Sequence, residues 1–185
     1  MATSPATSAA VTTWKIDPAH SSAEFKVKHM MISNVKGSIK GIAGDLQEHA
    51  TDSSLSMIEA TLDVSTLSTG DAQRDGHLKS ADFLDAEKFP TIAFKSTSVK
   101  KKGPEEYAVT GDLTIHGVTR PVTLEVEGPS APQKDPWGNT RIGLAATTKI
   151  NRKDFDLTWN ATLETGGILV GEEVHITIDL ELIKS

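Results

Sequence analysis

The feature that most constrains the fold is an alternation of apolar and polar residues with a period of two. In the clearest case, every second residue from Val174 to Leu182 is Val, Ile or Leu, and the residues between them are polar. Successive side chains of a β-strand point to opposite faces, so the pattern predicts strands with one dry and one wet face. Such strands are typical of antiparallel sheets. About nine candidates can be recognised, at 13–17, 23–27, 35–46, 58–64, 91–100, 109–115, 118–126, 142–150 and 174–182.

Two of these candidates are joined by only His116 and Gly117. A link of two residues needs positive φ angles, which Gly adopts freely and His tolerates better than most residues. The pair therefore predicts a tight antiparallel hairpin with a fixed register.

A set of strands of this kind closes as a barrel or stacks as a sandwich. Gly37, Gly41 and Gly44 interrupt one candidate, as expected where a strand bends sharply, and this favours a barrel. Three segments are not strands. Residues 71–88 predict one or two short helices, with Asp71, Ser80 or Asp82 as possible caps, and 128–139 and 165–173 predict loops rich in Pro or Gly.

The residues expected to face inward are mostly Val, Ile, Ala, Thr and Gly, and only 5% of the chain is aromatic. A barrel of about eight strands either fills its lumen with side chains or holds one slender ligand. Modest side chains favour an apolar cavity suited to a hydrocarbon-like ligand. A flattened barrel or a sandwich that closes on the same residues is the alternative.

The composition excludes several classes of protein. A chain of 185 residues with a net charge of −6 fits one domain and argues against nucleic acid as a partner. No apolar run approaches the roughly 20 residues of a membrane-spanning helix, and the lack of Cys excludes disulfides. Residues 1–13 predict a flexible arm before a domain at 14–185. The arm lacks the pattern of a secretory signal, so we expect a cytoplasmic protein, or a periplasmic one if the start is processed or engineered.

Six stretches together resemble the YceI-like family, in order along nearly the whole of residues 14–184. They are WKIDPAHS (14–21), HMMISNVKG (29–37), RDGHLKSADF (74–83), FPTIAFKST (89–97), GDLTIHGVTRPV (111–122) and NRKDF (151–155). The chain departs from the family pattern at Ile39, where an aromatic residue is common, and at Asp156, where Gly is usual.

The resemblance implies an all-β fold with a minor helix: an extended antiparallel lipocalin-like β-barrel of about eight strands with a short helical flap. It also implies non-catalytic binding, storage or transport of a long-chain isoprenoid lipid, such as an isoprenoid quinone or a polyprenyl phosphate, or of a similar amphiphile. A homodimer is expected, and many family members are exported to the periplasm.

On this basis the residues expected to line the lumen and contact lipid are large and apolar: Phe25, Val27, Met31, Ile39, Leu62, Phe83, Leu84, Phe89, Ile92, Phe94, Leu113, Ile115, Leu124, Ile142, Leu144, Trp159, Leu169, Ile176 and Ile178. Arg74, Asp75, His77 and Lys79 are candidates for a polar clamp on the lipid head group at the barrel mouth. The alternative is structural, with a local salt bridge between Arg74 and Asp75 and with His77 packed in the flap.

Two other functions remain open. An interaction or stress-response module would have a filled lumen and an exposed apolar patch on the 165–173 loop or the flap. An enzyme could use Asp75 and His77 as an acid–base pair, but residues two apart on a helix face different ways. We therefore expect no catalytic residues. The six His residues lack the close spacing of a zinc helix, so we expect no metal site and no cofactor beyond a bound lipid.

Overall fold

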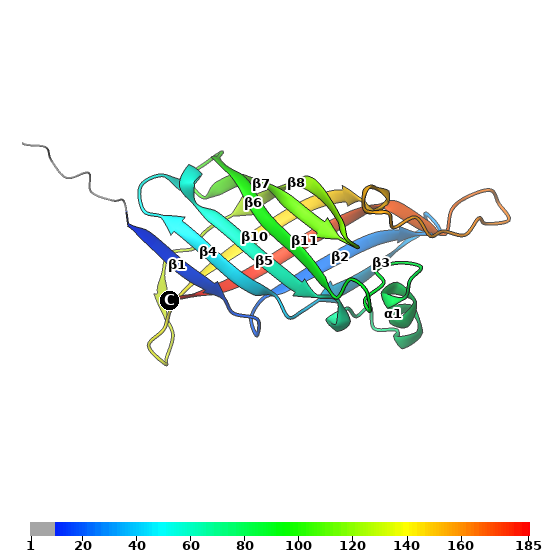
Figure 1. Cartoon of the computed structure of the whole chain (residues 1–185), viewed down its shortest axis with the longest axis horizontal. Helices are drawn as coiled ribbons and strands as arrows, with labels where there is room; N and C mark the ends of the chain where they lie inside the picture. The colour runs from blue at the N-terminus through cyan, green and yellow to red at the C-terminus, as the bar shows by residue number, and fades with distance from the viewer. Residues whose placement is uncertain (1–9) are drawn as a thin grey trace, which may run out of the picture.

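The computed structural model describes residues 10–185, which form an elongated β-barrel with a small helical unit at one end (Figure 1). The strands make one sheet and are β1 (Val11–Ile16), β2 (Ser22–His29), β3 (Ser33–Ile39), β4 (Ala43–His49), β5 (Met57–Asp63), β6 (Thr91–Lys101), β7 (Glu106–Ile115), β8 (Val118–Glu127), β9 (Gln133–Lys134), β10 (Thr140–Asn151) and β11 (Val170–Lys184). The helical elements are α1 (Ala72–Lys79) and the 3₁₀ turns η1 (Ser53–Leu55), η2 (Val64–Thr66) and η3 (Arg152–Phe155).

The sheet closes on itself because β11 pairs with β10 on one edge and with β1 on the other. The ring runs β11–β1–β4–β5–β6–β7–β8–β10 and returns to β11, with every pair antiparallel. This closed ring of eight strands confirms the predicted antiparallel barrel and excludes the sandwich. The first half of β11 pairs with β2 and its end pairs with β1, so the β2–β3 hairpin extends the wall along the same edge.

The candidate strand at 35–46 is wrong as a single element, because the chain breaks into β3 and β4 at Lys40, Gly41 and Ile42. Gly41 has a φ of +67°, which no regular strand accommodates. The hydroxyl of Thr66 bonds both the N–H and the carbonyl of Lys40 at 2.9 Å and so fixes the break. Ile42 then turns into the core and is only 2% exposed.

Two further boundaries differ from the sequence prediction. Strand β1 starts at Val11, inside the predicted arm, because its backbone pairs with β4 from Val11 onward. The part of the predicted arm at 1–9 lies outside the described residues. The loop predicted at 128–139 contains the two-residue strand β9, which pairs with β10.

The two-residue hairpin is present as predicted. His116 and Gly117 have φ angles of 53° and 72°, and Ile115 lies opposite Val118 in the β7–β8 register. The ring of Phe89 covers this turn, 4.9 Å from the ring of His116. A Cβ atom on Gly117 would lie 2.5 Å from Phe89, so the turn requires Gly for space as well as for φ.

The helical flap lies between β5 and β6, at the end of the barrel to the right of Figure 1. Asp71 caps α1 by accepting a hydrogen bond from the N–H of Arg74 at 2.9 Å. Ser80 ends the helix, and its hydroxyl donates to the carbonyl of His77 at 2.7 Å. Leu78 and Leu84 pack against the barrel core, which holds the flap over this end.

The core has two parts, one toward each end of the barrel. The larger part surrounds Phe155, Leu67 and Ile115 near the flap. The smaller part surrounds Trp14 and Leu182 near the other end. Among residues 10–185, no helix is both long enough and apolar enough to span a bilayer.

Candidate functional site

The barrel encloses one large cavity of about 760 Å³, within the roughly 300–1,000 Å³ that is typical of small-molecule sites. Its lining residues come from both ends of the barrel. Trp159 and Leu169 lie at the flap end, and Met57 and Tyr107 lie at the end with the β4–β5 connection. The cavity therefore follows the long axis of the barrel.

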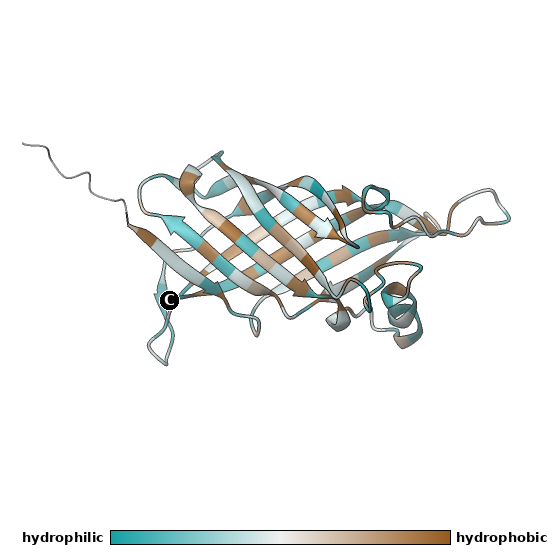
Figure 2. Cartoon of the chain, viewed as in Figure 1, coloured by the Kyte–Doolittle hydropathy of each residue, from teal (hydrophilic) through white to brown (hydrophobic). Residues whose placement is uncertain are grey.

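The walls of the cavity are apolar. Figure 2 shows apolar bands along the strands that alternate with polar ones. Inward-facing residues such as Leu124, Ile176 and Ile178 pack against the core clusters but are only half-buried, because part of each side chain faces the cavity. A barrel filled by its own side chains would bury these positions fully, so the filled-lumen alternative does not hold.

All but three of the residues predicted to line the lumen do line this cavity. Whether they contact a ligand stays a prediction. The residues at the cavity wall are Phe25, Val27, Ile39, Leu62, Phe83, Leu84, Ile92, Phe94, Leu113, Ile115, Leu124, Leu144, Trp159, Leu169, Ile176 and Ile178.

Met31, Phe89 and Ile142 lie elsewhere, and each is a correction. Met31 is at the tip of the β2–β3 hairpin with a φ of 60°, which turns its side chain outward and leaves it 59% exposed. Phe89 covers the β7–β8 turn. Ile142 belongs to the smaller core around Trp14 and is only 3% exposed, so its side chain is covered by core residues and does not face the cavity.

At the flap end, Arg74 lines the cavity but Asp75 does not, and no ion pair joins them within the described residues. Both bind Thr69 instead. The Arg74 Nε donates to the Thr69 hydroxyl at 2.7 Å, and that hydroxyl donates to the Asp75 carboxylate at 2.6 Å. The hydrogen bonds from Thr69 hold the pKa of Asp75 below its usual value. Asp75 therefore positions the flap and does not face a ligand.

His77 also lines the cavity and sits among aromatic rings. Its ring is 4.6 Å from that of Trp159 and 5.1 Å from that of Phe83, both edge to face. Its Nε2 is 2.9 Å from an oxygen of Asp82 and not near Asp75. The Asp75–His77 acid–base pair, which the sequence argued against, is therefore not formed, and the structural alternative for His77 describes what the structure shows.

Lys79, the fourth candidate for the clamp, does not line the cavity. It lies in the last turn of α1, where a cation interacts favourably with the helix dipole. Of the four residues predicted at the mouth, only Arg74 and His77 reach the cavity.

A residue that the sequence reasoning missed is Arg152, which lines the cavity and is only 3% exposed. Its guanidinium donates to the carbonyls of Leu157 at 2.6 Å, Gly171 at 2.8 Å, Trp159 at 2.9 Å and Val170 at 3.2 Å. Burial lowers the pKa of Arg152 below its ordinary value. No carboxylate forms an ion pair with it among residues 10–185, so the flap end of the cavity has a buried positive charge.

The opposite end of the cavity has a different polarity. Glu48, Asp52 and Lys101 line it there, together with Tyr107. Glu48 accepts a hydrogen bond from the indole N–H of Trp14 at 2.8 Å. The two ends are thus chemically distinct, with cations at the flap and mixed charges at the other end.

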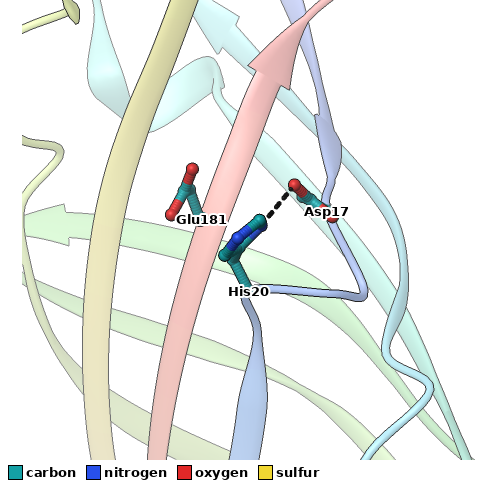
Figure 3. A group of neighbouring side chains, drawn as sticks. All are labelled: Asp17, His20 and Glu181. Carbon is teal, nitrogen blue, oxygen red and sulfur yellow. Dashed lines mark hydrogen bonds and ion pairs between the residues drawn. The ribbon is translucent and has the colours of Figure 1, made fainter. Parts of the chain in front are cut away.

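One group of side chains has the proximity of a metal site, namely Asp17, His20 and Glu181 (Figure 3). Its carboxylates are already engaged, because Nη1 of Arg141 donates to Asp17 and Glu181 at 2.7 Å each. The Nε of Arg141 donates to Asp135 at the same distance. The hydrogen bond from Arg141, followed by that with His20, lowers the pKa of Asp17 to about 2. The group is better described as an ion-pair network that ties β1, β10, β11 and the β9–β10 loop together.

Comparison with known proteins shows one consistent likeness. A family model described as a YceI-like domain matches residues 14–182. A UPF0312 protein of Vibrio parahaemolyticus is 42% identical over 139 residues, which are 75% of this chain and 73% of that protein. A UPF0312 protein of Staphylococcus aureus is 36% identical over 171 residues, which are 92% of this chain and 97% of that protein.

Solved structures show the same barrel. A Campylobacter jejuni YCEI protein has a TM-score of 0.71 and 28% identity over 85% of this chain and 90% of its own. BcnA of Burkholderia cenocepacia has a TM-score of 0.75 and 23% identity, with coverage of 90% and 98%. A polyisoprenoid binding domain from Saccharophagus degradans, implicated in plant cell wall breakdown, has a TM-score of 0.67 and 14% identity, with coverage of 93% and 98%. The last two likenesses show the fold alone.

Proposed function

Because the chain belongs to the YceI-like family, we propose that it binds a long-chain isoprenoid lipid, such as an isoprenoid quinone or a polyprenyl phosphate, in the barrel lumen. The binding is non-catalytic and serves storage or transport of the lipid. The observation that carries this proposal is the large apolar cavity that follows the long axis of the barrel.

The chemistry of the cavity fits a long hydrocarbon better than a compact polar molecule. Each methylene group that leaves water for an apolar wall contributes about 0.8 kcal/mol. A chain of several isoprene units therefore binds tightly without a polar anchor along its length. The side chains at the wall are mainly aliphatic and half-buried, so the lipid would complete their packing.

We place the lipid head group at the flap end. The cations Arg74 and the buried Arg152 line the cavity there, and an electron-rich or anionic head is favoured beside them. The tail would then extend toward Met57 and Tyr107. The polyisoprenoid binding domain from Saccharophagus degradans has the same fold, which agrees with a polyisoprenoid ligand for this barrel.

The interaction-module alternative is less well supported. It requires a filled lumen, whereas the barrel has a cavity, and it requires an exposed apolar patch on the 165–173 loop or the flap. Ile168, Leu169 and Val170 in that loop are half-buried. A homodimer is part of the proposal, and light scattering coupled to size-exclusion chromatography tests it.

The proposal is tested by loading delipidated protein with an isoprenoid quinone and, separately, with a polyprenyl phosphate, followed by mass spectrometry of the intact complex. Ala146 is buried at the cavity wall, so the variant Ala146→Trp should obstruct the lumen and lower the fraction of protein that carries lipid. The matched control is Thr147→Trp, because Thr147 is the next residue of β10 and is exposed on the outer face. Equal loading of Ala146→Trp and the control, or no loading of the unmodified protein, would contradict the proposal.

A further inference from the structure

The tip of the β2–β3 hairpin exposes three consecutive large apolar side chains. Met30 is 40% exposed, Met31 59% and Ile32 79%. The other large apolar residues this exposed among residues 10–185 are Val11, Leu55, Met57 and Trp137, and no three of them are consecutive. A run of exposed apolar residues usually marks an interaction surface.

The backbone of this tip is fixed in a conformation that points the side chains outward. Met30 and Met31 have φ angles of 50° and 60°, and the N–H of Ile32 bonds the carbonyl of His29 at 3.1 Å. Two positive φ angles of this kind define a type I′ turn, for which Asn and Gly are the usual residues. The N–H of Met30 also donates to the carbonyl of Leu169 at 2.8 Å, which holds the tip against the 160–170 segment.

The tip lies next to the apolar cavity. His29, immediately before the tip, lines the cavity, and so does Leu169, to which the tip is bonded. In Figure 1 the hairpin reaches the same end of the barrel as the flap. An apolar surface that borders an apolar cavity suits a partner made of hydrocarbon.

The hairpin behind the tip has lysines without acidic partners. Lys26 lies opposite Lys36 in the β2–β3 register, and Lys28 lies opposite Asn34. Within the described residues, none of these three lysines forms an ion pair, whereas four other lysines do. Like charges directly opposite each other in a sheet are destabilising, and a negatively charged partner would relieve the repulsion.

The neighbouring acids do not neutralise this cluster. Glu173 on β11 is engaged with Lys149 and with His175, which lies opposite Lys26. Glu172 is engaged with Lys153. Glu24 lies two residues before Lys26 on β2 and is the one remaining carboxylate on the hairpin itself. The hairpin is therefore locally basic, although the whole chain has a net charge of −6.

We propose that the Met30–Ile32 tip inserts into the surface of an anionic lipid bilayer while Lys26, Lys28 and Lys36 contact the lipid head groups. Apolar residues flanked by lysines are the usual composition of segments that bind such an interface. This docking places the cavity beside the bilayer from which a lipid enters or leaves. The role of this docking in lipid exchange rests on the proposed function, but binding to vesicles can be measured whether or not the lumen binds a lipid.

Sedimentation with vesicles of phosphatidylglycerol and phosphatidylcholine tests the docking. The combined variant Met31→Ser and Ile32→Ser should bind at least about tenfold more weakly, because two side chains that enter the bilayer are lost. Leu55→Ser is the matched control, since Leu55 is also 59% exposed but lies in η1, in the β4–β5 connection. Equal binding of the two variants, or no vesicle binding by the unmodified protein, would overturn the proposal.

The charge contribution is measured separately. Lys28→Glu with Lys36→Glu should weaken binding to the anionic vesicles more than Lys100→Glu with Lys134→Glu, a pair of exposed lysines elsewhere with the same change in net charge. Binding that is the same on pure phosphatidylcholine vesicles would overturn the role of the lysines. If the tip variant instead turns a dimer into a monomer and the unmodified protein ignores vesicles, the tip is a contact between copies and the proposal fails.

Loading from detergent separates this inference from the proposed function. The tip variants should load an isoprenoid quinone to the same extent as the unmodified protein, because Met31 and Ile32 do not line the cavity. Their transfer of quinone from vesicles should be slower. A protein that loads no lipid refutes the proposed function, and the sedimentation result then still decides the docking.

Discussion

Arg152 offers the sharpest test of how the flap end of the cavity is held together. Its guanidinium donates to four carbonyls, two of them (Leu157 and Trp159) in the segment that leads from η3 to β11 and two at the start of β11, on Val170 and Gly171. We consider Arg152→Met, which keeps an unbranched side chain of similar reach but removes every donor. The carbonyl of Val170 retains a second donor, Nδ2 of Asn160 at 2.8 Å.

The expected cost follows from the three remaining carbonyls. A buried acceptor left without a partner costs about 1–3 kcal/mol. Removal of the buried charge recovers part of its desolvation, which is the cause of the lowered pKa of Arg152. We therefore expect a loss near the lower end, about 3 kcal/mol in the free energy of unfolding, which is a large part of a typical stability of about 5–15 kcal/mol.

The assay is urea denaturation of delipidated protein at pH 7, with hydrogen exchange of residues 156–170 as the local readout. Arg152→Lys is the informative companion, because Lys retains the charge but cannot reach acceptors in the planar fork of Arg. It should lose roughly half as much stability and still expose the segment to exchange. One unsatisfied buried carbonyl alone should cost at least about 1 kcal/mol. A smaller loss of unfolding free energy for Arg152→Met would therefore refute this reasoning, and so would an Arg152→Lys variant as stable as the unmodified protein.

Three further predictions concern stability. Gly111→Ala should lower the unfolding free energy by about 1–3 kcal/mol, since its Cβ would lie 2.5 Å from both the carbonyl of Lys95 and the ring of Phe94, and a thermal melt checks it. Asp156→Gly should raise it by about 0.5–1 kcal/mol, because Asp156 has a φ of 58°; an unchanged or lower melting temperature would contradict this. The folded pKa of Asp17 is depressed to about 2 from 3.8, so its contribution is present above pH 4 and is lost as the pH falls through that window. Denaturation between pH 2 and 5 should show that Asp17→Asn flattens this dependence.

Much of the barrel could be predicted because its signals are local. The alternation that predicts β11 and the turn predicted at His116–Gly117 depend only on neighbouring residues, and the structure contains both elements. The break between β3 and β4 was missed, because Gly41 alone does not show that Thr66, far along the chain, binds the backbone of Lys40.

The site was less predictable for the same reason. Apolar character marks a residue as inward-facing only if it lies within a strand, and Met31 and Phe89 are in turns and links. Ile142 faces inward, but it is buried in the smaller core with Trp14 and Leu182 and does not reach the cavity. From the sequence alone, Arg152 would be expected at the surface, because it is a charged residue that follows an apolar strand. Its acceptors are backbone carbonyls, which leave no trace in the side-chain pattern.

The pairing of β11 with both β1 and β2 has a consequence for how the barrel forms. Trp14 finds its partner Lys184 across 170 residues of chain, so the ring cannot close until its last strand is in place. Contacts between residues this far apart in sequence slow folding, because the entropy of closing the loop is lost before the contact forms. Until β11 docks, β10, β1 and β2 each keep an unpaired edge. We expect that intermediate to be the state most prone to aggregate.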